Sequence, residues 1–196
     1  KLVGTTIGRP LPIEPRKENN RETIRKATEN DIQSVVNIYE NVIDHDINVK
    51  KTVGWKHGIY PTEDTARTGL AADDLYVMED GGRIVATARI NQEQLEEYRS
   101  ADWEHEVPDD KVLVLHTLAV DPSAAGRGYG TRFVAFYERL AGESGCTELR
   151  MDTNRINTPA RTLYAKLGYR EVGEIPCSFN GISDVRLLCL EKFIGE

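Results

Sequence analysis

The sequence of 196 residues is poor in cysteine, in long apolar runs and in excess positive charge, and each shortage excludes a class of protein. Its three cysteines, at positions 146, 177 and 189, are odd in number and widely spaced, which fits neither a disulfide framework nor a Cys-x-x-Cys metal site. We therefore expect reduced thiols, a cytoplasmic protein and no bound metal.

No segment approaches the ~18 consecutive apolar residues that a membrane-spanning helix requires, and nothing near the start resembles a signal peptide. The 25 Lys and Arg residues are outnumbered by 32 Asp and Glu residues, which gives a net charge of −7. That balance disfavours binding to nucleic acid through phosphate neutralisation and favours small cationic partners. The sequence predicts a protein with no nucleic-acid or membrane partner.

The chain has the length of one domain, with a short appendage at its start. Residues 1–20 carry three prolines among charged and small residues without apolar periodicity, so we expect an extended arm or a leader there. The first methionine is Met78, which is consistent with a leader or a processed start. Residues 21–196 are expected to form the single domain.

Apolar periodicity and turn residues predict the elements of this domain. Strands are expected over 23–26, 75–79, 83–90, 112–120, 148–153, 169–174 and 185–190, and helices over 28–43, 62–70, 131–143 and 158–167, with a loop at 176–184. The run 112–120 is almost continuously apolar, as in a central strand covered on both faces. Thr158 is the expected N-cap of the last helix, before Pro159. The order predicts an α/β fold in which a mixed sheet carries helices on both faces.

The segment from Ala125 to Gly130 is Ala-Gly-Arg-Gly-Tyr-Gly, between the apolar strand and the following helix. Three glycines allow a tight turn in which successive N–H groups and the helix N-terminus converge on an anion. The spacing is neither the GxGxxG of a dinucleotide fold nor the Gly-Lys-Ser/Thr ending of a P-loop. The segment is therefore either a different phosphate-binding loop or a plain strand-to-helix turn.

Neighbouring motifs favour phosphate binding. Leu-Ala-Val-Asp-Pro at 118–122 precedes the loop, and Asn157 and the run Leu-Tyr-Ala-Lys-Leu-Gly-Tyr at 163–169 follow it. In this order the motifs resemble the GNAT superfamily of acyl-CoA-dependent N-acetyltransferases, and the resemblance covers most of residues 22–193. It implies a single-domain, mixed but largely antiparallel sheet, splayed between its two central strands. One departure is Ala125, where the family carries Gln or Arg.

The resemblance also implies how acetyl-CoA, the expected cosubstrate, is bound. The backbone of Leu118 and Val120, on either side of Ala119, would pair with the pantetheine arm, and the Leu118 amide would polarise the thioester carbonyl. Asn157 would bind the cofactor arm, although it could instead only cap a helix. The pyrophosphate would lie against the loop made of Ala125, Gly126, Arg127, Gly128, Tyr129 and Gly130.

Two residues are candidates for proton transfer. Tyr164 matches the family tyrosine that protonates the leaving thiolate, and its alternative role is packing on its helix. His116 interrupts the apolar strand and, by alternation, is expected on the same face as Leu118, where it could act as the base that deprotonates the amine. Its alternative role is that of a satisfied core histidine. Asp152 is a weaker candidate for the base, because it could instead be a satisfied carboxylate at a strand end.

Acceptor pockets in the family are built from its variable segments. Here these segments supply Trp55, Tyr60, Trp103, Glu104, Glu106, Phe179 and Asn180. Aromatic rings beside carboxylates suit a cationic amine, although both tryptophans could equally be core residues. The predicted function is acetyl transfer to a primary amine of a small molecule or protein by direct attack in a ternary complex. A non-catalytic acetyl-CoA-binding module is the alternative, and a homodimer remains open.

Overall fold

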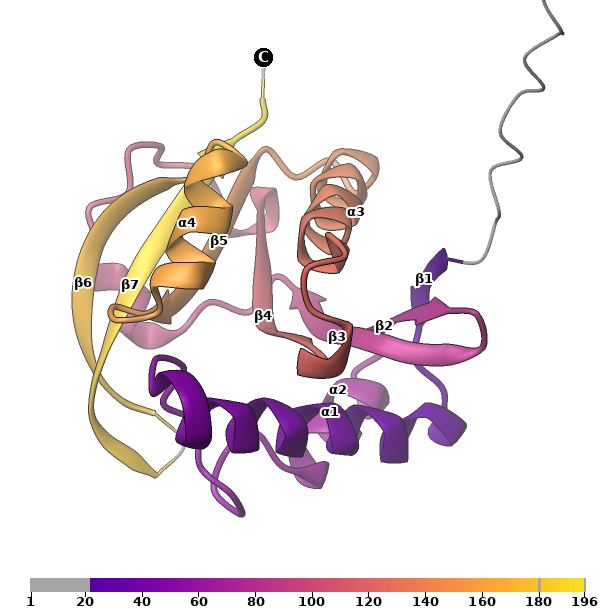
Figure 1. Ribbon diagram of the computed structural model, residues 1–196. Coiled ribbons are helices and arrows are strands. Elements are labelled where there is room, and N and C mark those ends of the chain that lie inside the picture. The colour runs from indigo at the N-terminus through magenta and orange to yellow at the C-terminus, as the bar shows by residue number, and fades with distance from the viewer. Residues whose placement is uncertain (1–21, 180, 196) are drawn as a thin grey trace, which may run out of the picture.

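The computed structural model describes residues 22–179 and 181–195, so the predicted arm at 1–20 lies outside the described residues. One seven-stranded sheet runs through the molecule in the order β1-β2-β3-β4-β5-β7-β6 (Figure 1). Its strands are β1 (Glu22–Lys26), β2 (Leu75–Asp80), β3 (Arg83–Asn91), β4 (Val112–Val120), β5 (Glu148–Asn154), β6 (Arg170–Phe179) and β7 (Ile182–Phe193). Only the β4–β5 pair is parallel, so the predicted mixed, largely antiparallel sheet is confirmed.

Helices cover both faces of the sheet, as predicted. On one face α1 (Ile32–His45) and α2 (Glu63–Ala71) pack on β2 and β4 through a cluster that includes Val35, Ile38, Tyr39, Val77 and Ala119. On the other face lie α3 (Tyr129–Glu143) and α4 (Thr158–Lys166). None of the described helices is long and apolar enough to cross a lipid bilayer.

The two central strands separate after a short paired stretch. β4 and β5 pair only from Val112 to Leu115 on one strand and from Glu148 to Met151 on the other. Both strands continue beyond that point, to Val120 and Asn154, without pairing to each other. The splay predicted from the resemblance is therefore confirmed, and it opens between α4 and α1 (Figure 1).

A bulge in β4 changes which side chains share a face. Thr117 adopts the left-handed conformation with φ of 54°, and the partners of Ala119 and His116 on β3 are Thr87 and Arg89. The extra residue on β4 reverses the side-chain alternation beyond it. Leu118 packs with the α3 cluster together with Leu115, so the expectation that His116 shares a face with Leu118 is wrong.

The last hairpin is longer than predicted. Strands were expected to end at 174 and to restart at 185, but Pro176 pairs with Arg186 and Cys177 with Val185 inside the ladder. β6 is an edge strand with two register shifts, so it tolerates a proline that would disrupt a central strand. The N-cap of α4 is also one residue earlier than predicted, at Asn157, whose side chain accepts from the Ala160 N–H.

Candidate functional site

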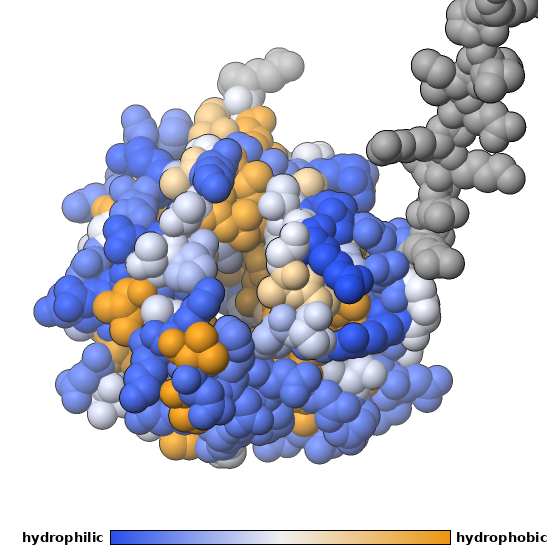
Figure 2. Space-filling view, in the orientation of Figure 1, coloured by the Kyte–Doolittle hydropathy of each residue, from blue (hydrophilic) through white to orange (hydrophobic). Residues whose placement is uncertain are grey.

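A cavity of about 200 Å³ lies where β4 and β5 separate. Its walls come from β4, the end of β5, the start of α4, β7 and the loop between α1 and α2. Figure 2 shows this face of the molecule hollowed near its centre. Predicted site residues from distant parts of the chain meet here, namely Trp55, Tyr60, His116, Leu118, Ala119, Val120, Asn157 and Tyr164.

The glycine loop has the geometry of an anion site next to this cavity. Gly126 and Gly128 take φ of 78° and 79°, a left-handed conformation that side chains disfavour. α3 begins at Tyr129, and the first N–H groups of a helix have no partner within it. The backbone therefore offers donors and a helix N-terminus to a pyrophosphate. Ala125 offers no polar side chain. The Tyr129 hydroxyl already donates to Asp80, so the group that Tyr129 offers to an anion is its backbone N–H.

The inner edge of β4 provides the second part of the cofactor site. Ala119 and Val120 pair with β3 on one side. On the other side no described strand pairs with β4 beyond Leu115. An extended chain with amides can add itself to such an open edge as an extra strand. The geometry thus fits a pantetheine arm along Leu118–Val120.

Asn157 and Tyr164 contribute from α4. The Asn157 side chain caps the helix and donates to Thr153 Oγ1 at 3.1 Å, and it also lines the cavity. Tyr164 is 6% exposed, packs against the Tyr169 ring and faces the cavity as well. Burial, and then the charge of Asp152, raise the pKa of Tyr164, so its phenol stays protonated at neutral pH.

His116 lines the cavity but is committed to a hydrogen bond. Its Nε2 lies 2.9 Å from Asn91 Oδ1, while Asn91 Nδ2 donates to Asp74 at 2.6 Å, which fixes the orientation of the amide. The imidazole therefore donates through Nε2 to Asn91. Burial and the nearby Arg89 guanidinium lower the pKa of His116 to about 4, so the ring is neutral and weakly basic.

Asp152, a weaker candidate from the sequence because it could be a satisfied strand-end carboxylate, lines the cavity. It is the first residue of β5 beyond the paired stretch, and its Oδ2 accepts a hydrogen bond of 2.6 Å from the Tyr98 hydroxyl. Burial raises its pKa to about 6, despite the opposing effect of the Tyr98 donor. Its negative charge also raises the pKa of Tyr60 and Tyr164. The sequence could not single it out, because no motif shows where two strands part.

The predicted acceptor residues Trp55 and Tyr60 lie on the α1 side of the cavity. Their rings meet edge to face at 6.1 Å, and the Tyr60 hydroxyl bonds Thr117 Oγ1 at the β4 bulge. The loop that carries them is anchored by Asp46, a residue that the sequence analysis missed. Asp46 accepts from the N–H groups of three consecutive loop residues.

A second hollow adjoins this side of the cavity. Tyr60, His116 and Thr117 line both, and the second is also lined by Asp64, Arg89 and Glu93. Arg89 is held bidentately by Asp74 at 2.8 and 2.7 Å, so its charge is largely neutralised.

The structure does not bring the remaining acceptor candidates to the cavity. Trp103 donates to the Tyr98 carbonyl at 2.7 Å and lies under the Arg150 guanidinium, away from the cavity lining. Glu104 pairs with Arg170, and Glu106 is likewise absent from the lining. Phe179 ends β6, with a side chain that the structure does not describe, and Asn180 lies outside the described residues.

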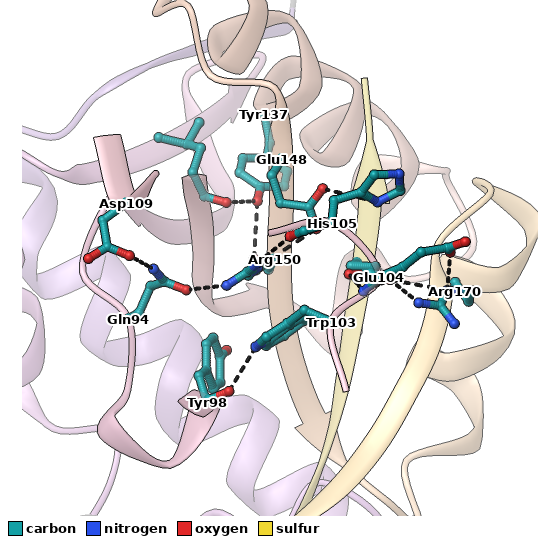
Figure 3. A network of polar contacts seen from close by, with 12 residues as sticks. Gln94, Tyr98, Trp103, Glu104, His105, Asp109, Tyr137, Glu148, Arg150 and Arg170 are labelled. Carbon is teal, nitrogen blue, oxygen red and sulfur yellow. Dashed lines mark hydrogen bonds and ion pairs between the residues drawn. The ribbon is translucent and has the colours of Figure 1, made fainter. Parts of the chain in front are cut away.

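One group of residues has the types that bind metals. Glu104, His105 and Glu191 are the only described trio of this kind, with ligand atoms within 4.8 Å of one another. Figure 3 shows Glu104 and His105 in this region, near Arg170. Arg170 binds both glutamates, at 3.0 Å from Glu104 and through two contacts to Glu191. Because the Arg170 guanidinium already pairs with both carboxylates, the arrangement is an ion-pair network at the far end of β5 and β7.

Comparison with known proteins agrees with this geometry. Residues 42–169 match the acetyltransferase (GNAT) family, about two thirds of the chain. The chain belongs to the GNAT family. Members of this family use acetyl-CoA as cosubstrate, and the match spans the splayed strands, the glycine loop and α4.

Solved structures share the GNAT fold. An acetyltransferase of the GNAT family from Streptococcus agalactiae superposes with a TM-score of 0.75 at 22% identity, over 89% of this chain and 96% of that one. The structure of yncA from Salmonella typhimurium, solved with its cofactor acetyl-CoA, gives 0.63 at 18% identity over 90% and 96%.

A curated relative matches over a shorter stretch. The uncharacterized N-acetyltransferase YhfO of Bacillus subtilis (strain 168) is 34% identical over 61 residues, which are 31% of this chain. The matched stretch spans only 41% of that relative.

Proposed function

We propose that this GNAT protein transfers the acetyl group of acetyl-CoA to a primary amine, which attacks the thioester directly. The observation that carries the proposal is the cavity at the splay. It joins the open edge of β4 to Tyr164 and Asp152, and its wall includes the loop that carries Trp55.

The chain offers a contact for each part of the cosubstrate. Acetyl-CoA supplies the activated acetyl group as a thioester. Its pyrophosphate would be held by the loop from Gly126 to Gly130, its pantetheine arm by the edge of β4, and Asn157 would contact the same arm. The backbone amide of Leu118 would donate to the carbonyl oxygen, where negative charge develops during attack.

Tyr164 supplies the proton that the leaving sulfur needs. Its phenol is protonated and lines the cavity. A reference pKa of about 10 against about 8.5 for a thiol means that the phenol remains protonated until a thiolate forms. The hydroxyl can then donate to the sulfur and recover a proton from the attacking nitrogen.

The acceptor that fits best is a cationic amine. Asp152 is the only carboxylate among the described residues that line the cavity at the splay. His116 is neutral at neutral pH, so no positive charge in the lining offsets the charge of Asp152. The Trp55 ring, which lines the same cavity, adds an aromatic surface that attracts ammonium groups. A small amine or an amine on a protein would satisfy this chemistry.

The proposal is tested by thiol release from acetyl-CoA with a panel of amines, beside a thermal-shift titration with acetyl-CoA alone. Amine-dependent release with a thermal shift supports the enzyme and ranks its acceptors. A thermal shift without release from any amine or lysine peptide would contradict catalysis and favour an acetyl-CoA-binding module. Absence of both would overturn the cofactor site.

A further inference from the structure

The strongest unexplained feature of the cavity is a half-buried carboxylate, Asp152, with one oxygen hydrogen-bonded and the other without a partner among the described residues. Asp152 Oδ2 receives the Tyr98 hydroxyl at 2.6 Å. Within the described part of the chain, Oδ1 has no hydrogen-bond partner, and the residue lines the cavity. An unsatisfied oxygen in a partly buried site costs free energy unless a ligand or water occupies it.

Tyr98 itself is built to hold this orientation. It is 1% exposed, comes from the short helical turn Glu96–Ser100, and packs edge to face on Trp103 at 5.3 Å. Trp103 in turn donates its indole N–H to the Tyr98 carbonyl. The segment between β3 and β4 therefore positions one phenol beneath the point where β4 and β5 part.

We propose that Asp152, positioned by Tyr98, is the catalytic base that removes a proton from the acceptor's ammonium group. This inference rests on the proposed acetyl transfer. Tyr98 is a positioning residue in this scheme, because it acts through the carboxylate and does not touch the reacting atoms.

The other polar groups around the cavity are less suited to this role. His116 donates its Nε2 proton in a hydrogen bond to Asn91, and its low pKa makes it a weaker base than Asp152. Tyr60 and Tyr164 are phenols that stay protonated. The titratable groups whose pKa values are coupled to that of Asp152 are Glu97, Tyr98, Tyr60, Tyr164, Cys177 and Cys189. Of these Glu97 is the other carboxylate, and its charge raises the pKa of Asp152, which makes Asp152 a stronger base.

The proton balance of the reaction is then complete. The ammonium loses one proton to Asp152, and the neutral nitrogen forms a bond to the acetyl carbon while the bond from that carbon to sulfur breaks. The second nitrogen proton reaches the sulfur through Tyr164. Asp152 returns its proton to solvent, so each turnover releases one proton and leaves both residues as they began.

The first test needs neither acetyl-CoA nor amine. Carbon-13 NMR of labelled aspartate carboxyls should show Asp152 titrating near pH 6 in the free protein. Tyr98→Phe removes a donor that lowers this pKa, so the midpoint should move upward by about one pH unit. A midpoint near the ordinary value of about 4, or no movement in Tyr98→Phe, would overturn the proposal.

The second test uses the best amine from the panel. Asp152→Asn should lower kcat by at least about 100-fold and remove the acidic limb of the kcat/KM profile, with the acetyl-CoA thermal shift retained. Tyr98→Phe should move that limb to higher pH and should keep far more activity at pH 9 than Asp152→Asn does. The matched control is Asp102→Asn, an exposed carboxylate outside the cavity, which should match wild type.

His116→Gln separates the two candidate bases. This variant should lower kcat less than Asp152→Asn does, and its kcat/KM profile should keep the acidic limb. The pKa of His116, about 4, lies well below the pH at which that limb is expected. If Asp152→Asn keeps kcat within twofold of wild type, or if His116→Gln is the variant that removes the limb, the assignment is wrong. A wild-type protein that releases no thiol would contradict acetyl transfer, whereas the NMR titration would still report on Asp152 and Tyr98.

Discussion

Asp46 Oδ2 accepts a hydrogen bond of 3.1 Å from the backbone N–H of Gly54, and so joins the end of α1 to the loop that carries Trp55. Its other oxygen accepts from the N–H groups of Thr52 and Val53, at 2.6 and 2.9 Å. Burial alone would raise the pKa of this carboxyl, but the backbone donors outweigh it and lower the pKa. One carboxylate thus orders the backbone on the acceptor side of the cavity.

Asp46→Asn should loosen the loop that carries Trp55 and should affect amine binding more than acetyl-CoA binding. An amide cannot accept the same donors through both of its atoms, and a loss of ~2 kcal/mol of charge-assisted hydrogen bonding is expected. In a protein of this size that lowers Tm by about 4–8 °C. We expect KM for the amine to rise several-fold, with KM for acetyl-CoA little changed. Equal rises in both constants would show that the loop does not shape the acceptor pocket.

Tyr164→Phe tests the proton donor to sulfur. The change removes only a hydroxyl, so the thermal shift caused by acetyl-CoA should persist while kcat falls by roughly 100-fold. Tyr169→Phe is the matched control, because its ring packs against Tyr164 and it does not line the cavity. A Tyr164→Phe turnover equal to that of the control would reduce Tyr164 to a packing residue.

Ala125→Arg tests the departure of the glycine loop from its family. Ala125 is exposed just before the loop, where a guanidinium could add a charge-assisted contact to the pyrophosphate. We expect Kd for acetyl-CoA to fall about 5-fold or more, the equivalent of ~1 kcal/mol. Ser123→Arg, at an exposed position earlier in the same turn, controls for added charge alone. An equal gain in both variants would indicate non-specific attraction.

The sequence predicted those parts of the site that are written in contiguous motifs. The glycine loop, the start of α4 and Tyr164 each follow from local turn, cap and helix signals, and Asn157 and Tyr164 both line the cavity. The strands and the helices on both faces of the sheet also follow from the apolar periodicity of their segments.

What escaped prediction depends on pairing between distant segments. The left-handed Thr117 reverses the alternation of β4, and nothing in an apolar run marks such a bulge. Asp152 lines the cavity because β5 stops pairing with β4 one residue earlier, at Met151. Trp103 is placed by Tyr98 and Arg150, which lie in other segments, so its spacing from the strand could not show that it lies outside the cavity.

A buried carboxylate at the opposite end of β5 gives the protein a pH-dependent stability. Glu148 is fully buried, with Arg150 Nε at 3.7 Å and His105 Nδ1 at 3.9 Å from its oxygens (Figure 3). Within residues 22–179 and 181–195, neither carboxylate oxygen of Glu148 has a hydrogen-bond partner. Burial and the neighbouring Glu191 raise the pKa of Glu148 to about 8, from a model-peptide value of about 4.3.

The sign of the effect follows from proton linkage. In the folded protein Glu148 binds a proton that the unfolded chain releases above about pH 4.3, so its contribution to stability is complete below that pH. The contribution declines as the pH rises and is lost as the pH passes the folded pKa of about 8. Wild-type Tm should therefore fall between pH 5 and pH 9 by more than in a variant without this carboxyl.

Glu148→Gln is that variant, because the amide has the shape of the protonated acid and cannot ionise. Its Tm should lie near that of wild type at pH 5 and exceed it at pH 9 by at least about 3 °C, the shift that ~1 kcal/mol produces in a domain of this size. Glu143→Gln, an exposed position on α3, should follow the wild-type curve at every pH. Parallel curves for wild type and Glu148→Gln would show that Glu148 is ionised in the folded protein, with Arg150 and His105 compensating its charge.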